Sequence, residues 1–164
     1  MTTDPLMSAI LAMDSYNRGY NEGITGLGGL NTLIGNYKII LQSDTLTGSS
    51  GVDAGFYAVA YQDTTTGQVT ISYRGTDQFL TANGIGGDII NGYGSGSGYT
   101  DTPQTQLAFD FYNTVKAAAP GSTISITGHS LGGGLAGLVG DVEGATTNVF
   151  EANDNRKMIL EKAA

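Results

Sequence analysis

The sequence predicts an α/β domain in which helices flank a partial, mostly parallel sheet. Three features lead to this prediction: a helix near the N-terminus, a β-hairpin over residues 56–75, and strands that alternate with helices from residue 104 onward. Such alternation is typical of a parallel sheet covered by helices. With 164 residues and neither an internal repeat nor a linker, residues 1–164 are expected to form a single domain.

The first predicted element is a helix over residues 5–20. Asp4 followed by Pro5 is a good N-cap and first-turn pair. Apolar side chains recur at helical spacing and should form the face that packs on the sheet. That stripe consists of Leu6, Ile10, Met13 and Asn17, widened by Met7 and Leu11.

The remaining elements alternate in type along the chain. A polar turn at 63–68 joins the two strands of the hairpin, and Pro120 and Gly121 end the clearest helix. The expected strands are 37–42, 56–62, 69–75, 123–127 and 146–152, and the expected helices are 102–120 and 131–140. The tail 153–164 is charged and helix-prone, and its composition differs from the rest of the chain.

Residues 77–102 are predicted to form a long surface loop with one short ordered piece. The segment is rich in Gly, Ser, Asn and Thr, but it carries an apolar patch at Ile85, Ile89 and Ile90. Unstructured loops of this length in compact domains are usually functional or disordered.

Composition excludes several classes of function. The net charge of −8 does not suit a nucleic-acid binder, which needs a basic face. The absence of Cys and the single His exclude thiolate zinc and multi-histidine metal sites, and we expect no metal and no cofactor. The N-terminus lacks the features of a signal peptide, and no apolar run is long enough to span a membrane. We therefore expect a soluble protein, with secretion by a C-terminal signal left open.

The pentad "GHSLG" at residues 128–132 fits the pattern G-x-S-x-G. The buried strand "TISIT" precedes it and a small-residue helix follows, so the serine stands on a strand-to-helix turn. Such a turn presents the Ser130 hydroxyl as a nucleophile, and the N–H of Leu131 points toward a developing oxyanion. Gly128 and Gly132 allow close backbone passage. Three further small residues should keep the helix near the sheet: Gly133, Gly134 and Ala136.

A second donor for the oxyanion is expected where an earlier strand ends. The stretch "ISYRGTD" at residues 71–77 places Gly75 and Thr76 directly after a strand. Gly75 allows the chain to bend toward the serine, and the backbone N–H of Thr76 would serve as the donor. An ordinary exit from a strand is the alternative, and the two stretches together favour the catalytic interpretation.

The combination of "YRGTD" and "ISITGHSLGGGLA" resembles the class 3 (fungal-type) lipase family of α/β-hydrolases, over most of residues 5–150. The resemblance implies an esterase or lipase that acts on acylglycerols or related esters without a cofactor. It implies that Ser130 is the nucleophile and that Thr76 and Leu131 form the oxyanion hole. It also suggests that part of 77–102 is a lid that covers an apolar acyl site; packing of the loop is the alternative.

The base and the acid of a catalytic triad are absent from the chain. In α/β-hydrolases the triad runs in the order Ser, acid, His, but no histidine follows Ser130. His129 precedes the serine on a sharp turn and should point away from it. Asp154 has no histidine to orient, and Asp141 and Glu143 are interpreted as solvated charges.

Three explanations remain open, in order of preference. The chain is a piece of a longer lipase-like protein, or it completes its site with another chain, or it is a non-catalytic module that binds a lipid or ester. In the first case the strand at 146–152 becomes an exposed apolar edge. We expect self-association or a partner segment at that edge.

Overall fold

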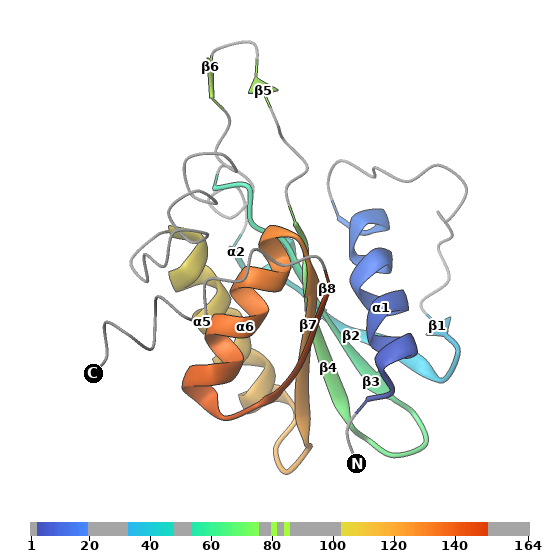
Figure 1. Cartoon of the computed structure of the whole chain (residues 1–164). Helices are drawn as coiled ribbons and strands as arrows, with labels where there is room; N and C mark the ends of the chain where they lie inside the picture. The colour runs from blue at the N-terminus through green and yellow to red at the C-terminus, as the bar shows by residue number, and fades with distance from the viewer. Residues whose placement is uncertain are drawn as a thin grey trace.

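The computed structural model describes residues 3–19, 33–47, 54–75, 80–81, 84–85 and 103–150. Helices and strands succeed one another along the chain as Figure 1 shows. The elements are α1 (Pro5–Asp14), the 3-10 helix η1 (Ser15–Asn17), β1 (Leu33–Ile34), β2 (Tyr37–Gln42), α2 (Asp44–Thr47), β3 (Ala58–Asp63), β4 (Val69–Tyr73), β5 (Leu80–Thr81), β6 (Gly84–Ile85), α5 (Pro103–Ala118), β7 (Ile124–His129), α6 (Leu131–Glu143) and β8 (Thr146–Phe150).

Six strands form one mixed sheet in the order β1-β2-β3-β4-β7-β8. The pairs from β1 to β4 are antiparallel, and the pairs β4–β7 and β7–β8 are parallel. The α/β fold class is confirmed, and so is parallel pairing in the second half of the chain. Short turns join β1 to β2 and β3 to β4, and such turns connect antiparallel neighbours, whereas α5 and α6 provide the crossovers that parallel strands need.

The hairpin β3–β4 is confirmed, and Asp63 organises its turn. The Thr65 N–H donates to the Asp63 carboxylate at 2.8 Å, and Gly67 adopts a φ of +76°. The Thr65 N–H is also the main reason that the pKa of Asp63 lies below its ordinary value. The polar segment between the strands thus forms a tight turn of its own.

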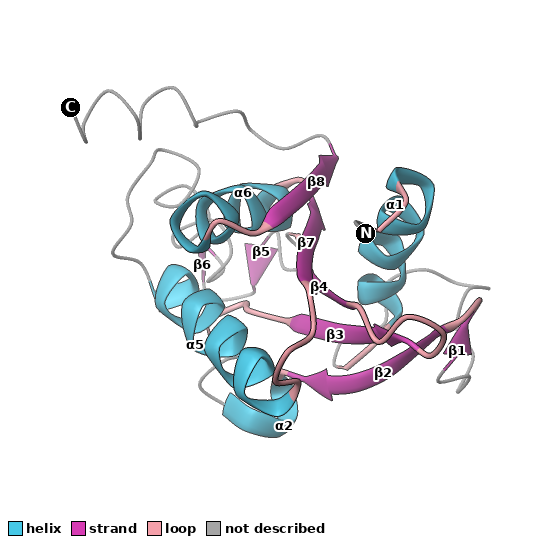
Figure 2. Cartoon of the chain, turned by 90° about the horizontal axis from the view of Figure 1, so that it is seen from below, coloured by secondary structure: helices cyan, strands magenta, loops and turns pink. Residues whose placement is uncertain are grey.

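Helices cover both faces of the sheet, α5 and α6 on one side and α1 on the other (Figure 2). Because strand side chains alternate, Ala58 and Ala60 of β3 lie in the α5/α6 core while Val59 and Tyr61 lie on the α1 side. The larger core comprises Phe56, Ala58, Ala60, Val69, Ile71, Tyr73, Ala108, Phe111, Tyr112, Val115, Ala119, Ile126, Leu135, Ala136 and Val139.

The α1 face of β4 and β7 carries hydroxyl groups rather than apolar side chains. The hydroxyls of Thr70 and Ser125 lie 3.1 Å apart, and Thr127 donates to the Ser8 carbonyl of α1 at 3.1 Å. Ser8 also accepts from the Asn148 amide of β8. Small and polar residues therefore bring α1 onto the sheet.

This polar contact overturns the predicted face of the N-terminal helix. Leu6, Ile10 and Met13 are exposed, with 69% of the Leu6 side chain open to solvent, whereas Leu11 and Ala12 are buried. The predicted stripe is thus correct only in part: Leu6, Ile10 and Met13 lie outward, whereas Leu11 and Asn17 are buried and Met7 packs against the core on the α1 side.

The start of α1 is confirmed and its end is earlier than predicted. The Asp4 carboxylate accepts the Leu6 N–H at 3.0 Å, as an N-cap does. The helix gives way to η1 after Asp14, and Gly19 follows with a φ of +68°. A Cβ at Gly19 would overlap the ring of Tyr57, so the chain turns there at close quarters.

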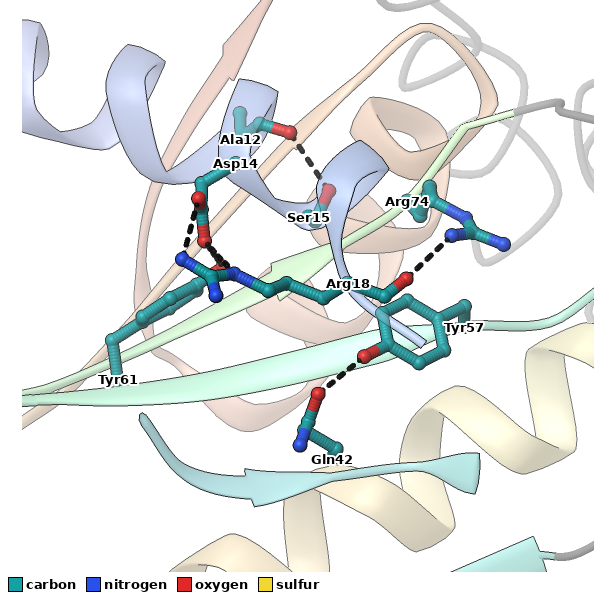
Figure 3. A network of polar contacts seen from close by, with 8 residues as sticks. All are labelled: Ala12, Asp14, Ser15, Arg18, Gln42, Tyr57, Tyr61 and Arg74. Atoms are coloured by element: carbon teal, nitrogen blue, oxygen red, sulfur yellow. Dashed lines mark hydrogen bonds and ion pairs between the residues drawn. The ribbon is translucent and has the colours of Figure 1, made fainter. Parts of the chain in front are cut away.

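A polar network fastens η1 to strands β3 and β4 (Figure 3). Arg18 pairs with Asp14 at 2.8 Å, and Tyr61 donates to the same carboxylate at 2.8 Å. Arg74 donates to the Arg18 carbonyl at 2.9 Å and lies 4.5 Å from the centre of the Tyr57 ring. The end of β4 and the end of η1 are thereby held together.

Several sequence predictions fall outside the described residues. Strands β5 and β6 pair as a two-residue antiparallel hairpin within the predicted loop 77–102, but the rest of that loop and the tail 153–164 lie outside them. The same is true of the last two residues of the predicted strand 146–152. Within the described helices, none has the length and apolarity needed to cross a bilayer.

Candidate active site

Ser130 stands on a strained turn between β7 and α6. Its φ of 56° and ψ of −124° make it the single non-glycine residue with positive φ among those that the structure describes. A side chain in this backbone region costs of order 1–3 kcal/mol, and such residues cluster at functional sites. The serine precedes α6 as its N-cap residue but makes no side-chain capping hydrogen bond. The Ser130 hydroxyl therefore does not cap α6.

Two glycines make the turn sterically possible. A Cβ at Gly128 would overlap the carbonyl oxygen of Gly132, and a Cβ at Gly132 would overlap the carbonyl oxygen of Tyr73. Both glycines of G-x-S-x-G are thus required by backbone contact. A Cβ at Gly134 would meet no atom within 4 Å, so the predicted role of Gly134 in close packing is wrong. Gly140 has that role, because a Cβ there would overlap the methyl group of Thr147 on β8.

Backbone hydrogen bonds fix the turn on both sides. The Ser130 N–H donates to the Phe150 carbonyl at the end of β8 at 3.0 Å, and the Ser130 carbonyl accepts the Gly134 N–H at 3.1 Å. Leu131 is the first residue of α6, where N–H groups have no acceptor within the helix. The N-terminal end of a helix also carries partial positive charge, which favours an anion beside Ser130.

The chain leaving β4 lies against this turn. Tyr73 pairs with Gly128 in the parallel register of β4 and β7, so Gly75 comes level with the serine. A Cβ at Gly75 would lie 2.6 Å from the His129 carbonyl oxygen and 3.4 Å from the Ser130 Cβ. The structure thus brings together the two stretches singled out in the sequence. Thr76 itself lies outside the described residues, so its role as an oxyanion donor stays a prediction.

The side chain of His129 contacts Tyr16 of η1. The Tyr16 hydroxyl lies 3.0 Å from His129 Nδ1, and the two rings meet edge to face with centroids 5.9 Å apart. The same hydroxyl accepts the Gly75 N–H at 3.1 Å. No sequence pattern marks Tyr16, since a tyrosine near the end of a helix is ordinary and its partners lie 59 and 113 positions away.

A cavity of about 460 Å³ lies beside the turn, between α1 and β8. Its lining is apolar apart from His129, which adjoins Ser130. The lining residues are Ala9, Ala12, Met13, His129, Val149 and Phe150.

Asp141 and Glu143, which the structure describes, do not join the site. Asp141 is exposed near the end of α6, and Glu143 pairs with Lys116 of α5 at 3.6 Å. Asp154 lies outside the described residues. Across the described part of the chain, no group of three His, Cys, Asp or Glu side chains could hold a metal ion.

Comparison with known families identifies the fold around this serine. A family model described as a Tle-like phospholipase domain matches residues 7–163. The chain belongs to this phospholipase-like family. The expected kinship with class 3 (fungal-type) lipases is confirmed at this level.

Curated relatives match over a short stretch. The proteins named "Putative lipase ATG15" from Kluyveromyces lactis and Vanderwaltozyma polyspora are 53% and 49% identical to this chain over 47 residues. That stretch is 29% of this chain but only 9% and 8% of the two relatives.

A solved lipase shares the fold. The nonglycosylated LIP2 lipase of Yarrowia lipolytica aligns with 89% of this chain at a TM-score of 0.53 and 18% identity. The alignment covers 56% of that lipase, so this phospholipase-like chain spans just over half of the length of the solved lipase whose fold it shares.

Proposed function

We propose that this phospholipase-like chain carries the nucleophile half of a carboxylic ester hydrolase, with Ser130 as the attacking residue. The observation that carries the proposal is the backbone of Ser130, strained at positive φ between a buried strand and a helix N-terminus. The exit of β4 beside it supports a two-donor oxyanion site made by the backbone N–H groups of Leu131 and Thr76.

The proposed reaction has two steps. Ser130 Oγ attacks the acyl carbon of an ester, its proton passes to a base, and the carbonyl oxygen gains negative charge facing the two donors. The carbon–oxygen bond to the leaving alcohol then breaks, and the alcohol takes the proton. Water repeats the attack on the acyl–Ser130 ester and releases a carboxylic acid.

The residue that acts as the base in this reaction must be supplied from elsewhere than His129. The only histidine is His129, and its Nδ1 is engaged by Tyr16. We propose that a second chain or a further segment supplies the histidine and the acid by pairing with β8. Strand β8 ends the sheet within the described residues, and the cavity between α1 and β8 is lined by Val149 and Phe150 of that strand and by His129. A second copy of the chain would bring only its own His129, so the proposed histidine belongs to a different chain or to a further segment.

The substrate class follows from the family. A phospholipase-like domain indicates an acyl ester of a phospholipid or a related acylglycerol. The loop 77–102 is the proposed lid over the acyl chain. Hydrolysis of a phosphatidylcholine compared with that of a triacylglycerol would separate the two head-group classes.

Labelling with a fluorophosphonate tests the nucleophile. We expect a single covalent adduct on Ser130, detected by intact mass and peptide mapping, and we expect Ser130→Ala to abolish it. Ser122→Ala is the matched control, because Ser122 lies at the opposite end of β7, and it should label as wild type does. A folded wild-type protein that takes no label, alone or with a partner chain added, would contradict the proposal.

The second candidate is a lipid- or ester-binding module without catalysis. The lack of a second histidine in the chain favours it. Binding to phospholipid vesicles that persists in Ser130→Ala, together with an unlabelled Ser130, would support this role instead.

A further inference from the structure

The hydroxyl of Tyr16 joins the two segments that form the proposed oxyanion site. It accepts the Gly75 N–H on the chain leaving β4, at 3.1 Å, and it lies 3.0 Å from Nδ1 of His129 on the turn. Gly75 directly precedes the proposed donor Thr76, and His129 directly precedes Ser130. One phenol oxygen therefore spans both sides of the site.

Tyr16 bonds the first backbone N–H beyond the pairing of β3 and β4. The Arg74 N–H still bonds the Tyr57 carbonyl at 3.0 Å, which continues the pairing of β3 and β4. The next N–H, that of Gly75, donates to Tyr16 instead. Without this acceptor the Gly75 N–H would have no fixed hydrogen-bond partner. The backbone conformation one residue before Thr76 would then be less restricted.

Tyr16 is well placed to act as a fixed point. It lies in η1, whose flanks are held by the Arg18–Asp14 ion pair and by the bond from Arg74 to the Arg18 carbonyl (Figure 3). Its ring also meets the His129 imidazole edge to face at an interplanar angle of 71°. Several independent contacts thus restrict the position of the phenol oxygen.

We propose that Tyr16 is a positioning residue that sets the distance between the chain after β4 and the turn at Ser130. This inference rests on the proposed function for its catalytic meaning, though not for its structural content. The Gly75 N–H can only donate, so the Tyr16 oxygen accepts there. The hydrogen bond between the Tyr16 hydroxyl and His129 Nδ1 runs in the direction that the imidazole tautomer sets.

The single histidine makes this arrangement measurable. The chain contains no other imidazole, so its nitrogen signals in a ¹⁵N-labelled protein belong to His129 alone. In the wild type we expect the Nδ1 signal to carry the shift of a hydrogen-bonded nitrogen. In Tyr16→Phe we expect the Nδ1 signal to lose the hydrogen-bond shift and the Gly75 amide to exchange with solvent at least about tenfold faster. Unchanged His129 and Gly75 signals in Tyr16→Phe would overturn the proposal.

Labelling at Ser130 tests the catalytic consequence. We expect Tyr16→Phe to slow fluorophosphonate labelling by about tenfold or more, since loss of one oxyanion donor costs about 10²–10³ in rate and misplacement costs part of that. The control is Tyr73→Phe, which also removes one tyrosine hydroxyl. That hydroxyl donates to the Ala108 carbonyl on the α5 face of the sheet, away from Tyr16. The control should lose stability and keep its labelling rate per folded molecule.

The two proposals fail in different ways. If wild-type Ser130 takes no label, the proposed function fails and the nuclear magnetic resonance comparison still decides the role of Tyr16. If wild-type protein labels and Tyr16→Phe labels equally fast despite the altered Gly75 signal, Tyr16 is a structural residue only and the positioning role is wrong.

Discussion

At the scale of single residues, the site depends on backbone contacts that exclude side chains. Ser130 is held at positive φ, and the carbonyl oxygens of Gly132 and Tyr73 occupy the space where Cβ atoms of Gly128 and Gly132 would lie. The strain at Ser130 is sustained because these neighbours leave the turn no other path. The absence of side chains at Gly128 and Gly132 is therefore what allows the turn to hold Ser130 in this conformation.

Two glycines of α6 provide a matched comparison. We expect Gly132→Ala to lower the free energy of unfolding by at least about 2 kcal/mol, since the new methyl group would collide with backbone that cannot move easily. Gly134→Ala has open space around it and should raise the free energy by about 0.5–1 kcal/mol, as alanine does within a helix. Urea unfolding followed by circular dichroism measures both. Changes of the same sign would contradict the steric argument.

The sequence was sufficient to locate Ser130 but not its surroundings. The pentad 128–132 is local, and its glycine spacing follows from the sharpness of one turn. Tyr16 belongs to the site through contacts over 59 and 113 positions, which no local pattern encodes, whereas Gly75 was predicted from its place after a strand. Thr76 follows from its place after a strand, and its contribution remains a prediction.

At the scale of elements, α1 shows why periodicity predicts the existence of a helix better than its buried face. The apolar spacing of Leu6, Ile10 and Met13 is helical, yet these side chains are exposed. The partner surface on β4 and β7 carries hydroxyl groups, and that surface forms only in the folded sheet. The strands were easier to predict, because β-branched residues and turn residues alternate over short distances.

A pair of leucines on α1 tests this orientation. Leu11 is fully buried and Leu6 is 69% exposed, although each was predicted to lie toward the core. We expect Leu11→Ala to cost about 2–5 kcal/mol of stability, because it leaves a cavity in the buried cluster that includes Tyr57, Val59 and Tyr61. Leu6→Ala should change stability by no more than about 0.5 kcal/mol. Thermal and urea unfolding of the two variants provide the measurement, and equal losses would mean that α1 is rotated.

At the scale of the whole molecule, burial of tyrosine side chains links stability to alkaline pH. Burial raises the pKa of Tyr61 and of Tyr73 well above the ordinary value of about 10. The protonated phenol is thus favoured in the folded state. This contribution to stability is complete below about pH 10, and it declines as pH rises further because the unfolded chain releases those protons first.

The slope of that decline is a testable quantity. Each tyrosine that stays protonated only in the folded state should remove about 1.4 kcal/mol of stability per pH unit above about pH 10. Tyr73→Phe should therefore reduce the slope by about that amount, measured by urea unfolding between pH 9 and pH 12. An identical slope in the variant would show that Tyr73 ionises equally in both states.

The overall fold was predictable in outline because each connection follows from a local signal. The turn after Asp63 gives an antiparallel hairpin, and α5 and α6 give parallel crossovers. The antiparallel first half of the sheet was the part that alternation alone did not reveal.

The hydrogen bond from Ser130 to the Phe150 carbonyl has a thermodynamic consequence for assembly. Because the last strand holds the serine, any chain that docks along that strand and shifts it also shifts the affinity of the serine for a reversible ligand such as a boronic acid. By thermodynamic linkage, a ligand bound at the serine must change the affinity of the docking chain by the same factor.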